Sequence, residues 1–86
     1  MNPTAQLKLR AFLKACLSDA GDHQDFADDS SLFVSGRLDS LAMTKLVMFL
    51  EDTFQIDFGE VDFDVDLIDS IDDIKAFVDM ELARRA

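Results

Sequence analysis

One serine in this chain stands where its hydroxyl could carry a charged group. Ser40 follows Asp39 and precedes Leu41, and the apolar pattern after it predicts that a helix begins here. The free N–H groups and the positive dipole end at a helix start favour a negatively charged group. Asp and Ser are also preferred helix caps, so capping explains part of the pattern. Ser40 is therefore a candidate for modification, and helix capping is the plainer alternative.

The other residues that could do chemistry stand alone. Cys16 falls on an apolar stripe at helical spacing, where a small core residue is expected rather than a reactive thiol. His23 has no second histidine and no cysteine nearby, so we expect a solvated loop residue rather than a metal ligand. A glycine-rich phosphate loop is also missing. The sequence therefore predicts no catalytic residues, and we expect a protein that is not an enzyme.

A run of alternating acids could suggest a calcium site. It consists of Asp62, Asp64 and Asp66. An EF-hand loop needs Gly at its sixth position and Glu at its twelfth, and these positions hold Leu67 and Asp73. The apolar residues between the acids favour burial, so we expect a solvated acidic face and no specific metal site.

Helical periodicity dominates the rest of the chain, which we interpret as one domain covering 1–86. Helices are predicted at about 3–18, 40–54, 62–68 and 71–84, with a long first loop between the first two. The expected helix caps are Asn2, Asp39 and Ser70. We expect the second helix to bury Leu46, Val47, Leu50 and Phe54, and the last helix to bury Ile71, Ile74, Phe77, Val78 and Leu82. The loop is expected to be pinned to the core by its apolar residues Phe26, Leu32, Phe33 and Leu38.

Apolar and acidic residues alternate over 61–67, which would also suit a β-strand. No other segment of the chain has a strand pattern that could pair with this one, and an isolated strand would leave its backbone groups without hydrogen bonds. The predicted fold is therefore an all-α bundle of four helices with a short third helix.

Composition narrows the classes of partner. The net charge is −10, from 18 acidic and 8 basic residues, and the chain has no Trp or Tyr. This balance argues against binding of nucleic acid or an anionic membrane surface, and no apolar run approaches membrane-spanning length. A single cysteine allows no internal disulfide, which suits a reducing cytosol. We expect a cytoplasmic monomer that does not insert into membranes.

The stretch around Ser40 resembles a known family. Residues 36–41 read Gly-Arg-Leu-Asp-Ser-Leu, and 46–56 continue as L-V-x-x-L-E-x-x-F-x-I. This pattern is similar to the attachment motif and second helix of the acyl carrier protein family, which includes peptidyl and D-alanyl carriers. The resemblance extends over about 5 to 82 and includes the long first loop.

The resemblance implies a function without catalysis. In that family the serine receives 4′-phosphopantetheine from coenzyme A, so the arm is expected on Ser40, between Asp39 and Leu41. The arm ends in a thiol that holds acids as thioesters. We expect a free-standing acyl carrier protein for fatty acid, polyketide-type or other specialised biosynthesis. The alternatives are an aminoacyl, D-alanyl or peptidyl carrier and, from another class, an acidic interaction module without a prosthetic group.

The expected partners are a phosphopantetheinyl transferase, a ligase that loads an acyl or aminoacyl group, and a downstream synthase or transferase. Carriers of fatty acid synthesis usually line this helix with acids, yet Ala42 and Lys45 stand here where acids are frequent. The segment 36–41 is instead similar to that of D-alanyl and other aminoacyl carriers. We expect these partners to contact Leu41 and a set of further residues, namely Arg37, Met43, Lys45, Glu51 and Asp52.

Overall fold

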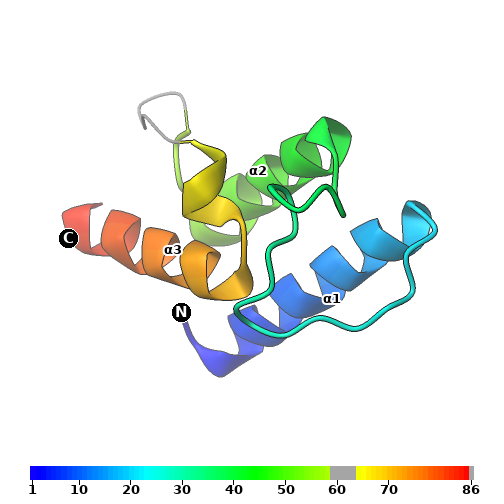
Figure 1. Ribbon diagram of the computed structural model, residues 1–86. Coiled ribbons are helices and arrows are strands. Elements are labelled where there is room, and N and C mark those ends of the chain that lie inside the picture. Colours follow the sequence, from blue (N-terminus) through cyan, green and yellow to red (C-terminus); the bar gives the residue numbers. More distant parts are fainter. Residues whose placement is uncertain (59–63, 86) are drawn as a thin grey trace.

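The structure is a computed structural model that describes residues 1–58 and 64–85 (Figure 1). It contains three α-helices, α1 (Pro3–Asp19), α2 (Ser40–Phe54) and α3 (Ile71–Arg85), and one short 3-10 helix, η1 (Val65–Ile68). None of the described residues belongs to a strand. The all-α class is therefore as predicted from the sequence.

The predicted count of four helices is not confirmed, because the third element is a single 3-10 turn. Its N–H groups are satisfied locally: Asp64 accepts from Asp66 N–H at 2.9 Å and from Leu67 N–H at 3.1 Å. Ile68 is fully buried, and Ser70 already caps the next helix. On the C-terminal side of η1 the chain therefore has no room for an α-helix. The first residues of the predicted helix, 62 and 63, lie outside the described residues.

Polar caps begin the three α-helices where the sequence predicted them. Asn2 Oδ1 accepts the N–H of Ala5 at 2.7 Å, with Pro3 at the first helical position. Ser70 Oγ accepts the N–H of Asp73 at 3.1 Å, as expected for a weak capping box. Asp39 caps α2 in the same way. These capping hydrogen bonds can be predicted from the sequence, because each joins two residues that are three positions apart.

Helices α1 and α2 run antiparallel, side by side. The rings of Phe12 and Phe49 stack with their centroids 4.7 Å apart, and nearer the loop Cys16 lines the same cleft as Lys45. Later residues of α1 therefore lie beside earlier residues of α2. This pairing brings the end of α1 beside Ser40, the first residue of α2.

One core joins the three helices and the long loop. α2 buries Ala42, Leu46 and Leu50, one residue per turn, so Val47 and Phe54 are only half-buried rather than fully buried as predicted. Leu82, predicted on the buried stripe of α3, is 39% exposed. The other large fully buried residues are Leu9, Leu13, Leu17, Leu32, Ile68, Ile71, Ile74 and Val78.

The loop 20–39 runs back along α1 to the start of α3 before it turns to the start of α2 (Figure 1). The sequence predicted that its apolar residues pin it to the core, and this is confirmed: Phe26, Leu32, Phe33 and Leu38 are all buried. Arg10 fixes the first part by donating to Phe26 O at 2.9 Å and by pairing with Asp28. The loop is therefore a packed part of the fold.

Asp69 is the main polar anchor of this loop. Its carboxylate accepts from the Ser31 hydroxyl at 2.5 Å and from the N–H groups of Phe33 and Val34 at 2.7 and 2.8 Å. Its carbonyl also accepts the N–H of Leu32 at 2.8 Å. Burial alone would raise the pKa of Asp69, but the donated hydrogen bonds outweigh it and lower the pKa below its usual value.

We expect Asp69→Ala to lower the free energy of unfolding by about 2 kcal/mol, because three donors lose a charged acceptor. Urea unfolding followed by circular dichroism measures this. Asp66→Ala is the matched control, since Asp66 is an exposed acid only three residues away, and it should change stability by less than about 0.5 kcal/mol. Equal losses in the two variants would show that the Asp69 bonds do not stabilise the fold.

The same contact predicts a dependence on pH. A carboxyl whose pKa is lowered by folding contributes stability above its unfolded pKa and loses it as the pH falls through the folded pKa. The difference in stability between the wild type and Asp69→Asn should therefore be constant above about pH 5. It should shrink as the pH falls below 3.8, the usual value. A difference that persists at lower pH would contradict a charged anchor.

Crowded acids give a further prediction. No Lys or Arg occurs from 47 to 73, and the exposed acids of this part include Glu51, Asp52, Asp66 and Asp73. Like charges repel less when salt screens them. The melting temperature at neutral pH should therefore rise as sodium chloride is added, and potassium chloride should act equally. A flat or falling trend would show that the acids are already dispersed or paired.

Candidate functional site

Ser40 is the first residue of α2, and its side chain is exposed. The residue two before it, Leu38, is 4% exposed and donates its N–H to Leu32 O at 2.7 Å. Asp39 then takes an extended conformation, with φ −104° and ψ −174°. The chain thus leaves the core at Leu38 and presents the Ser40 hydroxyl to solvent at the helix start.

The start of α2 has a partly satisfied set of N–H groups. An α-helix leaves its first four N–H groups without intrahelical acceptors. Of these four, Asp39 Oδ1 accepts the N–H of Ala42 at 3.0 Å. The next N–H, that of Met43, makes the first regular helix bond, to Asp39 O at 3.0 Å. The helix dipole adds a positive potential at Ser40. This geometry favours an anionic group bonded to the Ser40 hydroxyl, and the capping role of Asp39 predicted from the sequence is confirmed.

Arg37 holds the last part of the loop against its first part. Its Nε donates to Asp22 Oδ2 at 2.9 Å and its Nη2 donates to Gln24 O at 3.0 Å. The hydrogen bond with Arg37 is the main reason that the pKa of Asp22 is lowered, and the same bond raises the pKa of Arg37. The guanidinium that was predicted to contact partners is therefore engaged within the chain.

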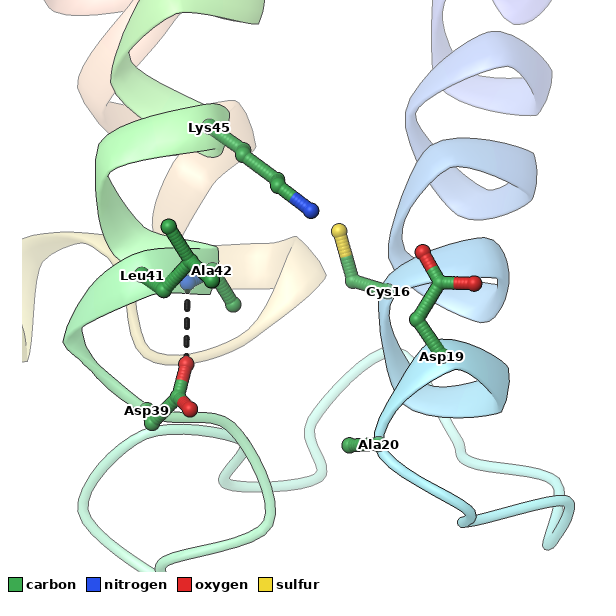
Figure 2. A pocket seen from close by; sticks show the side chains of 7 residues that line it. All are labelled: Cys16, Asp19, Ala20, Asp39, Leu41, Ala42 and Lys45. Atoms are coloured by element: carbon green, nitrogen blue, oxygen red, sulfur yellow. Dashed lines mark hydrogen bonds between the residues drawn. The ribbon is translucent and has the colours of Figure 1, made fainter.

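A cleft opens between the end of α1 and the start of α2, where Asp39 and Leu41, the sequence neighbours of Ser40, line it (Figure 2). It has a volume of about 100 Å³ and is lined by Cys16, Asp19, Ala20, Asp39, Leu41, Ala42 and Lys45. Cys16 is 8% exposed, as predicted for a core residue. Burial raises the pKa of its thiol, the nearby charge of Lys45 lowers it, and the charges of Asp19 and Asp39 raise it further. The thiol is thus mostly protonated at neutral pH.

The predicted docking residues do not form one cluster. Leu41 is 63% exposed and Lys45 is exposed, and both lie within two turns of Ser40. Met43 is half-buried against the core. Glu51 and Asp52 are exposed, but they lie about 17 Å farther along the axis of α2 at 1.5 Å per residue. Leu41 and Lys45 are therefore the exposed members of this set that lie nearest to Ser40.

Sequence reasoning missed Asp19 and the cleft itself. Asp19 lies one turn after Cys16 on α1, which is visible in the sequence. Its position on the same cleft as Lys45 depends on the antiparallel packing of α1 and α2, for which the sequence offers only the two apolar stripes. A pairing of Phe12 with Phe49, had it been predicted, would have aligned these residues.

His23 is exposed, with its Nδ1 at 3.3 Å from Ser18 Oγ. Among residues 1–58 and 64–85, no three His, Cys, Asp or Glu side chains are grouped as metal ligands would be. Of the calcium-like acids, Asp62 lies outside the described residues. In the described part of the chain, no helix is both long and apolar enough to span a membrane.

Comparison with known families gives one match. The sequence model of the family described as "phosphopantetheine attachment site" matches residues 10–78, which includes the loop, α2 and most of α3. No curated protein and no solved structure matches the chain. Members of this family are carrier domains without catalysis that hold 4′-phosphopantetheine covalently. The chain therefore belongs to the phosphopantetheine attachment site family, the carrier proteins of the acyl carrier type.

Proposed function

We propose that the protein is a carrier that bears 4′-phosphopantetheine on Ser40 and presents a thioester-bound acyl group to partner enzymes. The observation that carries the proposal is the exposed Ser40 hydroxyl at the start of α2, directly after buried Leu38 and beside the Asp39 cap. The residues fit the prosthetic group: an accessible oxygen, a positive helix end and space alongside.

The chain positions the Ser40 hydroxyl and does not itself activate it. Ser40 Oγ would attack the pantetheine-bearing phosphorus of coenzyme A, lose its proton, and displace 3′,5′-ADP. A transferase must supply the base and the metal ion, since the nearby acid, Asp39, is held as a cap. When bound, the arm supplies a thiol that forms thioesters. Leu38 and the loop anchors keep the attachment point fixed while the arm moves.

An aminoacyl, D-alanyl or peptidyl carrier is the alternative within the same class. The loop end that reads Gly-Arg-Leu-Asp-Ser-Leu supports it. The cargo distinguishes the two: incubation of the loaded form with hydroxylamine releases an acyl or an aminoacyl hydroxamate, which mass spectrometry identifies.

The proposed docking surface is the exposed part of α2 beside Ser40, with Leu41 and Lys45 at its centre. Arg37 and Met43 are less available to a partner, because Arg37 is bound to Asp22 and Met43 packs on the core. The acids Glu51 and Asp52 would serve only a partner that extends along α2.

We expect Ser40→Ala to fold normally and to gain no mass, because Asp39 still caps α2. The measurement is intact mass after incubation with coenzyme A and a phosphopantetheinyl transferase. Ser18→Ala, another exposed serine at a helix end, is the control and should gain one arm like the wild type. An arm on Ser40→Ala would contradict the assignment. A wild type that gains none from several transferases would favour the acidic interaction module.

We also expect Lys45→Glu to slow loading by the cognate ligase and to improve recognition by fatty acid synthesis enzymes. The exchange replaces repulsion from a basic docking patch with attraction. Initial rates of loading measure both effects. Lys8→Glu, with the same charge change at an exposed position on α1, should alter neither rate by more than about twofold. Unchanged loading rates for Lys45→Glu would show that Lys45 does not determine which partner enzymes recognise the carrier.

A further inference from the structure

The cleft beside Ser40 presents two charged groups from opposite walls. Figure 2 shows Lys45 extending from α2 toward α1, and the Cys16 thiol extending from α1 toward α2. Asp19 adds a carboxylate from the α1 side. A hydrogen-bond donor and a hydrogen-bond acceptor therefore line one narrow space.

These two groups are not paired with each other. Among the ion pairs of the described residues, none includes Lys45 or Asp19. The third charged group of the cleft, Asp39, already holds the N–H of Ala42. A ligand with an acceptor on one edge and a donor on the other would satisfy Lys45 and Asp19 together. An amide group has this arrangement.

The floor and mouth of the cleft suit a thin chain. Ala20, Ala42 and Cys16 have small side chains, so a narrow chain can lie between the helices. Leu41, 63% exposed, offers apolar surface at the mouth. A volume of about 100 Å³ holds one segment of a chain and excludes a bulky cargo. The fitting ligand is thus slender, carries amides and has some apolar substituents, which describes pantetheine.

We propose that, given attachment at Ser40, the pantetheine arm folds back into this cleft, where Lys45 donates to an amide carbonyl and Asp19 accepts the amide N–H. The axial part of the distance is within reach of the arm. Lys45 lies five residues beyond Ser40, about 7.5 Å along the helix axis and about 140° around it, so the arm passes around the start of α2 to enter the cleft. Six bonds join Oγ to the first amide carbon of the arm, which spans on the order of 7 Å when extended. The cargo end stays outside the cleft.

Cys16 is a built-in reporter for this proposal, because it lines the cleft and is the one cysteine of the chain. The holo protein is prepared with S-methyl coenzyme A, so that the arm has no free thiol. Intact mass first establishes that the arm is on Ser40. The rate of Cys16 alkylation by iodoacetamide is then compared between the holo and apo forms of the same variant at alkaline pH.

In the wild type we expect alkylation to be about fivefold slower in the holo form, which corresponds to an arm that occupies the cleft about four fifths of the time. Lys45→Met keeps the stem and removes the ammonium, so its holo and apo rates should agree within about twofold. Asp19→Ala should behave in the same way. Using a ratio within each variant cancels the effect of Lys45 on the pKa of the thiol.

Matched controls separate the cleft from charge in general. Lys8→Met and Asp29→Ala remove the same groups at exposed positions that do not line the cleft, and they should keep the fivefold protection. As a second readout, nuclear Overhauser effects should connect the geminal methyl groups of the arm with the Ala42 methyl group.

The outcomes distinguish this proposal from the proposed function. If the wild type acquires no arm on Ser40, the attachment assignment fails. If the arm is attached but Cys16 reacts equally fast in both forms, and no contact with Ala42 is seen, the cleft proposal is overturned while the carrier function stands. Protection that survives both Lys45→Met and Asp19→Ala would also overturn the assigned hydrogen bonds.

Discussion

The carboxylate of Asp69 is the contact on which the position of the candidate site depends. It receives hydrogen bonds from Ser31, Phe33 and Val34, and its own carbonyl receives one from Leu32. Long connections in compact domains need such anchoring, because their backbone groups otherwise lack partners and their ordering costs entropy. With this half of the loop fixed to the start of α3, the chain that leads to α2 has a defined origin.

The consequences can be followed along the chain from that anchor. Leu32 accepts the N–H of Leu38 and so fixes the last buried residue before the site. Asp39 and Ser40 then emerge at the helix start, while Arg37 ties the same segment to Asp22. The Arg37 pair is partly solvated, so it contributes less than the packed segment does. The packed loop therefore fixes the position of Ser40 at the surface, outside the core.

The sequence predicted the local features well and the long-range ones poorly. The helix caps and the buried helix faces can be predicted from the types of residues that lie three or four positions apart. The loop residues that pack on the core can be predicted because they are apolar. The 3-10 form of η1 could not be predicted, because it depends on how the buried residue Ile68 packs on the core, which is a tertiary contact. The engagement of Arg37 and the cleft at Lys45 depend on tertiary packing, which a single sequence does not encode in any local pattern.

The packing of α1 against α2 then determines what surrounds the serine. Stacking of Phe12 on Phe49 sets the register of two antiparallel helices, and that register aligns Cys16 with Lys45. A slip of one turn would displace the two walls by about 5.4 Å and would separate the charged groups that line the cleft. The contacts that stabilise the core far from Ser40 therefore also shape the space next to it. A substitution at Phe12 or Phe49 would act on the site through this register, without touching the serine or its cap.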